Sequence, residues 1–227
     1  MNPNNDSDIE TPSYGLSSVR IMTLADGVFA IVLTLLVLDI KAPEAISEAE
    51  LISKLLALWP KLFSYIISFV ILGILWFGHH MEFHYIRRSD RIHIWLNLLF
   101  LMCIAFIPFS AALLGSNLQN RVAIAIYGTN LIAAGLVRYF HWRYITYGHR
   151  LVDVDMDVRI IRKVQRIFLI VPFTYLLAIC LSFVSIPASL VLYALIPVLY
   201  IRPPREDRYL TSLRSQRINQ DDSVTKT

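Results

Sequence analysis

The chain has 227 residues, of which 56% are hydrophobic and only 17% are charged. A soluble domain carries charge on about a quarter of its residues, so this composition argues against an ordinary soluble domain and favours a protein that crosses a membrane several times. The net charge is +4. Basic residues near the ends of membrane helices account for such an excess, which therefore does not indicate a nucleic-acid partner.

The two ends of the chain differ in composition from its middle. Residues 1–19 are polar and acidic and lack the basic segment and apolar core of a signal peptide, so we expect a disordered tail there. Residues 20–202 hold the long apolar segments, and residues 203–227 are polar again. The sequence therefore predicts one membrane domain between two tails.

The first apolar segment, residues 21–40, is long enough to cross a bilayer core as a helix of about 20 residues. It contains Asp26 about two turns from its start. A carboxylate inside a membrane helix is costly and usually faces protein or water. Asp26 is therefore a candidate functional residue.

The same segment has an apolar stripe along one side. At about 100° per residue, Ile31, Leu35 and Leu38 fall on one face of the helix, and Thr34 borders that face. Asp26 lies on another face. The periodicity alone does not decide whether the stripe meets lipid, another helix or a pore.

Five further apolar segments follow, so the sequence predicts six membrane-spanning helices and an all-α fold. The expected ranges are 55–86, 92–114, 122–144, 167–184 and 190–201. The first of these is long for one crossing, and Trp59-Pro60 is either a bend or the true start of its helix. Pro108 predicts a kink in the next one.

An even number of spans places both ends of the chain on one side of the membrane. Basic residues gather on that side, around residues 87–91 and 143–166 and again at 202–217, whereas the opposite connections hold few. Since cytoplasmic connections are enriched in Lys and Arg, we expect both termini in the cytoplasm and the protein in a plasma membrane of bacterial type.

Polar side chains of the first three spans are expected at a similar depth, near the cytoplasmic side. We predict that Asp26 bonds to Asn97 and to His79 or His80, with the indole N–H of Trp76 as a further donor. Such a network is either structural or a site that gates the protein or transfers protons.

His80 and His84 have the i, i+4 spacing that can place two imidazoles on one metal ion. The chain offers no second pair of this kind, because His93, His141 and His149 lie far apart in the sequence. It also shows no hydrolase triad pattern, phosphate loop or CxxC pair. We therefore expect no enzyme, no structural metal site and no cofactor.

Residues 20–40, RIMTLADGVFAIVLTLLVLDI, resemble the signature helix of the transmembrane protein 175 family, the endosomal and lysosomal potassium channels and their bacterial relatives. The family pattern is Arg, three residues and Phe-Ser-Asp, followed by Gly-Val-Phe-Ala-Ile and Thr-Leu-Leu. Arg20 and Asp26 match, while Leu24-Ala25 replaces the usual Phe-Ser. The resemblance continues in ILWFGHH at 74–80 and in NLLFLMCIAFIPFSAALLG at 97–115.

The resemblance implies a potassium-permeable cation channel of modest selectivity, without a small-molecule substrate. Eukaryotic members are similar to two fused six-helix units, which implies a homotetramer of this chain with the first helix of each subunit lining a central pore. It places a hydrophobic constriction at Ile31, continued by Leu35 and Leu38. Arg20 belongs to the motif, although an interfacial anchor explains it equally well.

Selectivity for transient potassium ions cannot come from a cage of backbone carbonyls, because the chain has no TVGYG loop. It would come from the width of the pore, from Thr34 and from the field of the acids Asp39, Glu44, Glu48 and Glu50. A proton-coupled or proton-conducting transporter that uses Asp26 and the histidines of the second helix is the alternative.

Overall fold

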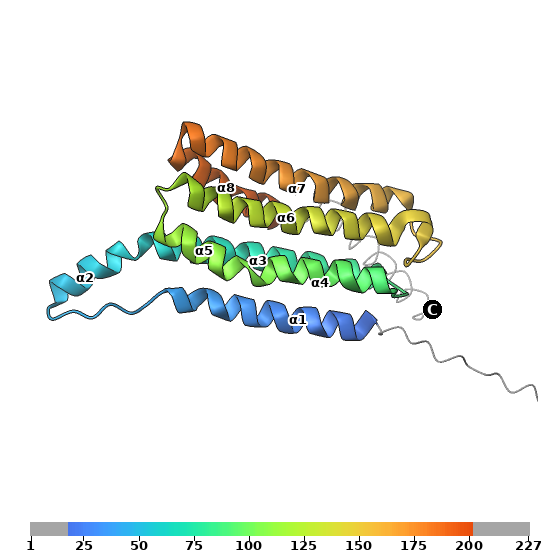
Figure 1. The fold of residues 1–227 in the computed structure, drawn as a ribbon, viewed down its shortest axis with the longest axis horizontal. Helices are drawn as coiled ribbons and strands as arrows, with labels where there is room; N and C mark the ends of the chain where they lie inside the picture. The colour runs from blue at the N-terminus through green and yellow to red at the C-terminus, as the bar shows by residue number, and fades with distance from the viewer. Residues whose placement is uncertain (1–17, 202–227) are drawn as a thin grey trace, which may run out of the picture.

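The computed structural model describes residues 18–201, which form a bundle of roughly antiparallel helices (Figure 1). The expected tails lie outside these residues, except that Ser18 and Val19 begin the first helix. The long elements are α1 (Ser18–Leu35), α3 (Trp59–Tyr85), α4 (Arg91–Ala105), α5 (Ile107–Ser116), α6 (Arg121–Thr146) and α7 (Val158–Val184). We call the end of the bundle at which α1 begins the proximal end, and the opposite end the distal end.

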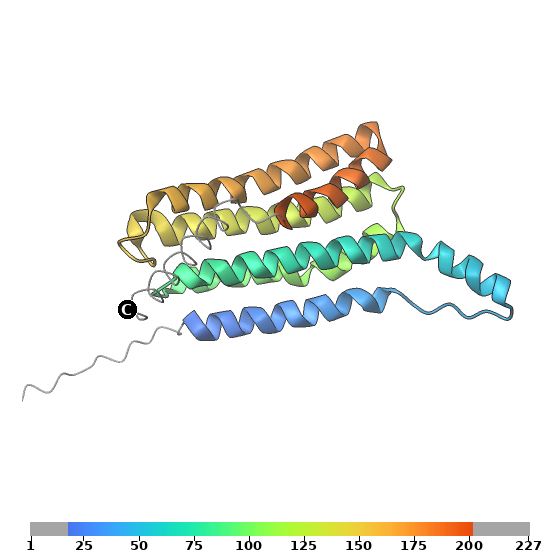
Figure 2. The ribbon, with the colours of Figure 1, turned by 180° about the vertical axis from the view of Figure 1, so that it is seen from behind.

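Five segments are long and apolar enough to cross a membrane, which confirms a polytopic all-α protein. They are Ser18–Asp39, Trp59–Tyr85, Arg91–Ser116, Arg121–His149 and Val158–Val184. The sixth expected span is the shorter helix α8 (Ile186–Ile201), which turns back along α7 and ends well before the proximal end (Figure 2).

The helix α1 packs one face on the bundle and continues into a 3₁₀ turn, η1 (Leu36–Asp39). Its buried side chains follow the helical repeat and include Ala25, Phe29 and Val32. They pack on α3 and α4, so the remaining faces of α1 stay open along its whole length.

The connection after η1 contains a helix that the sequence analysis did not predict, α2 (Glu48–Ala57). Its N-cap is Ser47, whose side chain accepts a hydrogen bond from the backbone N–H of Glu50, as in the first half of a capping box. No residue of α2 is buried, and the helix projects from the distal end (Figure 1). The next helix, α3, starts at Trp59 with Pro60 in its first turn, so Trp59-Pro60 is the true start of the span.

Two other boundaries follow from local chemistry. The predicted kink at Pro108 is confirmed as the break between α4 and α5. The helix α7 begins at Val158 instead of residue 167, because Asp157 caps it by accepting a hydrogen bond from the backbone N–H of Arg159. The basic run at 159–166 is therefore helical, and η2 (Tyr147–His149) belongs to the connection before it.

Close approach of α6 to α8 depends on Gly128. The buried Tyr193 of α8 lies against it and donates its hydroxyl to the carbonyl of Ile124 at 3.3 Å. A Cβ placed on Gly128 would overlap the Tyr193 hydroxyl and would lie 2.7 Å from Ile179 of α7.

We expect Gly128→Ala to destabilise the protein by about 1–3 kcal/mol, because overpacking forces rigid buried side chains apart. Gly73→Ala is the matched control, since a Cβ there meets nothing within 4 Å and alanine favours the helix. Thermal unfolding of the purified variants in detergent measures the difference. Equal stabilities would show that α6 and α8 are not held this closely.

Candidate functional site

The apolar stripe of α1 lies on the open side of the helix. Ile31, Leu35 and Leu38 are 61%, 42% and 69% exposed, and Thr34 is exposed beside them. By contrast, Val32 is only 2% exposed because it belongs to the face that packs on the bundle. The one row of aliphatic side chains that matches the family motif is thus free to meet another molecule or lipid.

The turn η1 affects how this stripe continues. Side chains three residues apart are eclipsed in a 3₁₀ helix, so Leu38 is brought nearly into line with Leu35. The hydroxyl of Thr34 donates to the carbonyl of Ile31 at 2.7 Å. That bond uses the hydroxyl proton and leaves the lone pairs of the oxygen for another partner.

The predicted polar network is divided into two separate contacts. The indole N–H of Trp76 donates to Asp26 Oδ1 at 2.8 Å, which connects α1 to α3. His79 Nε2 donates to Asn97 Oδ1 at 2.8 Å inside the bundle.

The predicted bonds from Asp26 to the histidines and to Asn97 are therefore wrong. The ring of Phe29, and not Asp26, packs on His79, with the ring centroids 6.1 Å apart, while Asp26 is half-buried. His80 is exposed and its ring lies 5.9 Å from that of Trp76. Arg20 is exposed in the first turn of α1.

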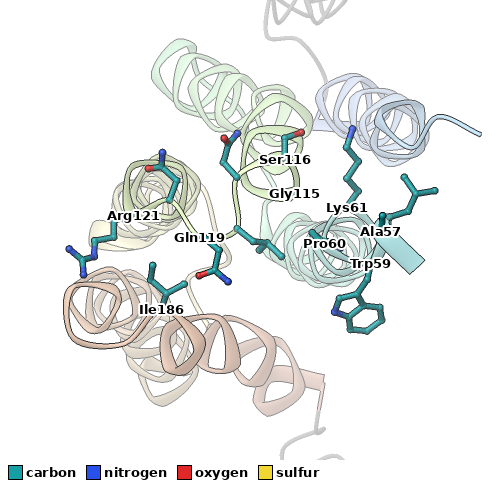
Figure 3. A pocket seen from close by; sticks show the side chains of 13 residues that line it. Ala57, Trp59, Pro60, Lys61, Gly115, Ser116, Gln119, Arg121 and Ile186 are labelled. Atoms are coloured by element: carbon teal, nitrogen blue, oxygen red, sulfur yellow. The ribbon is translucent and has the colours of Figure 1, made fainter. Parts of the chain in front are cut away.

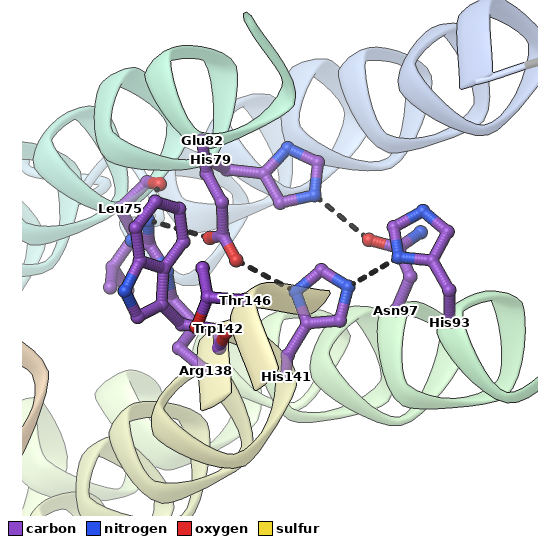
Figure 4. Close-up of polar contacts among 9 residues, drawn as sticks. All are labelled: Leu75, His79, Glu82, His93, Asn97, Arg138, His141, Trp142 and Thr146. Carbon is purple, nitrogen blue, oxygen red and sulfur yellow. Dashed lines mark hydrogen bonds and ion pairs between the residues drawn. The ribbon is translucent and has the colours of Figure 1, made fainter. Parts of the chain in front are cut away.

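A second buried group of polar side chains lies nearby and was not predicted (Figure 4). Glu82 of α3 pairs with Arg138 of α6 at 3.2 Å, with the two side chains 1% and 6% exposed. His141 Nδ1 donates to the other oxygen of Glu82 at 2.8 Å. With both imidazoles neutral, His93 Nδ1 of α4 donates to His141 Nε2 at 2.7 Å. We call Glu82, His93, Arg138 and His141 the Glu82 cluster.

The Glu82 cluster joins α3, α4 and α6 inside the bundle. Arg138 also donates to the carbonyl of Leu75 at 3.3 Å, and its guanidinium lies 4.4 Å from the centre of the Phe168 ring. Its Nε atom and the Nε2 atom of His93 are buried without a hydrogen-bond partner among the described residues. The signal that could have revealed the cluster is Arg138, because a charge inside a span requires a buried partner and Glu82 is the acid at matching depth.

The histidines do not assemble a metal site in the described part of the chain. No group of three or more His, Cys, Asp or Glu side chains that could hold a metal ion occurs there. His80 is exposed, while His93 and His141 are bonded to each other.

Two of the four acids expected at the pore mouth already have cationic partners. Lys61 pairs with Asp39 at 3.4 Å, and Lys54 pairs with Glu50 at 2.7 Å. The Lys54 ammonium, together with the backbone N–H of Ile46, lowers the pKa of Glu50. The carboxylates of Glu44 and Glu48 remain exposed.

An open hollow of about 1180 Å³ lies at the distal end, between the start of α3, the turn from α5 to α6 and Ile186 of α8 (Figure 3). Its charged side chains are Lys61 and Arg121, both of which are basic. This hollow therefore does not offer the anionic lining that a cation site needs.

The bundle, with its apolar spans and buried polar contacts, is that of a polytopic membrane protein. A family model described as the endosomal/lysosomal potassium channel TMEM175 matches residues 20–108. The chain is 37% identical over 187 residues to a protein of Streptomyces collinus named as a potassium channel, covering 81% of this chain and 91% of that protein. These matches place the chain in the TMEM175 family, which is a family of channels and not of enzymes.

Two further comparisons agree with this family assignment. A crystal structure described as a lysosomal potassium-selective channel TMEM175 homolog from Chamaesiphon minutus has 31% sequence identity and a TM-score of 0.72, covering 81% of this chain and 95% of that chain. The human protein named as the endosomal/lysosomal proton channel TMEM175 is 37% identical over 103 residues, covering 42% of this chain and 20% of that protein.

We expect Glu82→Gln to destabilise the protein by about 3–5 kcal/mol, because it leaves the Arg138 charge buried without its partner. The control is Asp153→Asn, which breaks the exposed pair between Arg87 and Asp153 and costs about 1 kcal/mol or less. Unfolding of both variants in detergent measures the two losses. A Glu82→Gln variant as stable as the control would mean that the cluster does not hold α3 to α6.

Proposed function

We propose that this protein is a potassium-permeable cation channel of modest selectivity, in which four copies surround one axis and α1 of each copy lines the pore. The relatives from Streptomyces collinus and Chamaesiphon minutus that support this proposal are described as potassium channels. The match covers nearly the whole length of each relative, so the similarity extends over the complete channel subunit and not only over its first helix.

The observation that carries the proposal is the open face of α1 with Ile31, Leu35 and Leu38. The interior of a single bundle is filled by fully buried side chains such as Leu72, Phe100 and Tyr127. A path for ions is therefore better built between copies than through one copy.

A ring of Ile31 side chains would form an apolar constriction. Such a ring stops ions by excluding water when it is narrow, and it needs no charge to do so. Next to it, the oxygen of Thr34 would offer its lone pairs to a passing cation, because its proton is already bonded to the carbonyl of Ile31. Selectivity from this source is modest compared with a cage of carbonyls.

The negative electrostatic potential of the acids at the distal end is weaker than the sequence alone suggests. Lys61 and Lys54 offset the charges of Asp39 and Glu50, so Glu44 and Glu48 are the acids that would attract cations there.

Proton conduction is the second candidate, since a human relative is named as a proton channel and the Glu82 cluster holds two histidines. However, the hydrogen-bonded chain His93–His141–Glu82–Arg138 ends at the carbonyl of Leu75 and does not include Asp26. A relay through Asp26 and these histidines would need further steps. Flux that saturates and follows a pH gradient would favour the transporter, whereas current down either gradient favours the channel.

The proposal places both termini in the cytoplasm of a bacterial-type cell, with the proximal end inside and the distal end outside. In a background in which Cys103 and Cys180 are replaced, we expect Ser47→Cys to label from outside intact cells. We expect Asp155→Cys to label only after the cells are opened. Labelling of both positions from the same side would contradict this orientation.

For the constriction, we expect Ile31→Asn to raise potassium flux into liposomes and to reduce the preference for potassium over sodium, because amide groups wet the ring. Equivalent changes at Leu35 or Leu38 should act less strongly. A lipid-facing control is Leu177→Asn on α7, where the native side chain is also exposed. Val32 of α1 is buried and cannot serve as this control.

Unchanged flux and selectivity for a folded Ile31→Asn variant would mean that the stripe is an ordinary packing surface.

A further inference from the structure

A shallow groove follows α6 along the distal half of the bundle, and its volume is about 520 Å³. Ala125, Thr129 and Ala133 are four residues apart, so these small side chains form one row along its floor. Phe106 at the break between α4 and α5 and Phe183 at the end of α7 flank the row and are 45% and 63% exposed. A row of small side chains beside two large rings therefore leaves a hollow, and its volume is within the range of pockets that bind small molecules.

The groove is about as long as one leaflet of a bilayer is thick. Its first residue, Arg121, also begins a segment that is long and apolar enough to cross the membrane, Arg121–His149. From Arg121 to Ala133 the helix rises by about 18 Å, at about 1.5 Å per residue. Since the hydrocarbon core of a bilayer is about 30 Å thick, each leaflet contributes about 15 Å of it. The groove thus extends from the headgroup region to near the middle of the membrane, as an acyl chain does.

Arg121 places a positive charge at the distal end of the groove. None of the described residues that line the groove is acidic, and none of the ion pairs in the described part of the chain involves Arg121. Its guanidinium lies 6.0 Å from the centre of the Phe183 ring, and a contact with the face of a ring leaves N–H donors for another partner. A guanidinium matches the geometry of a phosphate, whereas the lining offers no carboxylate for the cationic part of a zwitterionic headgroup.

The groove lies on a side of the bundle that neither α1 nor α8 covers. Figures 1 and 2 show α6 and α7 across the bundle from α1, so copies that gather around α1, as proposed above, leave this side toward lipid. Gly128 meets Tyr193 of α8 on another face of α6, about 100° from Thr129, and no described residue of α8 lines the groove. The medium at this depth is hydrocarbon, which fills an apolar hollow more readily than water does.

We propose that this groove binds one anionic phospholipid from the leaflet at the distal end, with the headgroup phosphate at Arg121 and an acyl chain along the row from Ala125 to Ala133. Arg121 selects the anionic headgroup, and the apolar lining selects a lipid over a free anion. Figure 3 shows the Arg121 side chain at the rim of the bundle, beside the distal end of α7, where a headgroup can approach it. The site does not involve α1, so its occupancy does not depend on whether α1 lines a pore.

The test is photocrosslinking of the purified full-length protein to analogues of phosphatidylglycerol or phosphatidylcholine that carry a diazirine in the middle of an acyl chain. Mass spectrometry of the peptides locates the crosslinks. We expect the phosphatidylglycerol analogue to label residues 125–133 more strongly than the phosphatidylcholine analogue does. The surface around Leu177, an exposed residue of α7 that does not line the groove, should be labelled equally by both.

Substitutions of basic residues test the headgroup contact. Arg121→Gln should reduce the preference for phosphatidylglycerol about fivefold, the factor that one basic residue supplies at an anionic membrane surface. Arg121→Lys should retain most of the preference, because it keeps the charge. Lys41→Gln is the control, since it removes an exposed charge near the same end of the bundle that does not line the groove.

A second pair of variants tests the row of small side chains. Thr129→Phe fills the groove and should abolish the preference, whereas Val191→Phe should not, because it enlarges a side chain of the same shape on an exposed face of α8. Thermal unfolding confirms that each variant is folded. The readout does not require conduction, so failure of the lipid site and failure of the proposed channel are told apart.

Several outcomes would overturn the proposal. These are equal labelling of residues 125–133 by the two lipids, equal losses in Arg121→Gln and Lys41→Gln, and a preference unchanged by Thr129→Phe. Full competition by inorganic phosphate would indicate a free anion site instead. Labelling of residues 125–133 in isolated subunits but not in the assembled protein would assign the groove to a second copy.

Discussion

The ion pair between Glu82 and Arg138 holds together the part of the bundle on which α1 rests. It joins α3 to α6, and the bonds through His141 and His93 extend the contact to α4. Next to this pair, the centre of the Phe100 ring lies 5.6 Å from the Arg138 guanidinium. His79 stacks on Phe100 with ring centroids 5.5 Å apart, and Phe29 of α1 packs on both rings. The direction in which α1 faces therefore depends on a charge pair that α1 itself does not touch.

The pair acts mainly by excluding other arrangements. A buried ion pair adds little net stability compared with apolar side chains, but leaving one of its charges unpaired is costly. Sliding α3 along α6 by a turn would separate Glu82 from Arg138, so the pair favours one register of these helices. That register keeps Phe29 and Val32 against the bundle and leaves Ile31, Leu35 and Leu38 on the open face.

Hydrophobic length predicted the five long spans, and Trp59-Pro60 was one of two interpretations for the start of α3. The contact of Trp76 with Asp26 was predicted from the matching depth of the two side chains. These features are local, or they follow from depth in the membrane. The Glu82 cluster was missed because it depends on which faces of α3, α4 and α6 meet. A helix that is apolar all round has no distinct apolar face, so its sequence period does not show which side packs on a neighbour. The helix α2 had a local signal, since Ser47 and Glu50 have the spacing of a capping box. The hydropathy pattern placed the start of the last helix at residue 190, whereas α8 begins at Ile186.

The central claim is that the open face of α1 surrounds an ion path shared between copies. The most direct measurement is the effect of Cd²⁺ on potassium flux through an Ile31→Cys variant that lacks Cys103 and Cys180. Thiolates bind soft metal ions tightly, so cysteines around one axis should trap Cd²⁺ and stop the flux, while Leu177→Cys in the same background should be unaffected. Flux that continues unchanged in Cd²⁺ through Ile31→Cys, in protein whose thiols are shown to be reduced, would contradict the account.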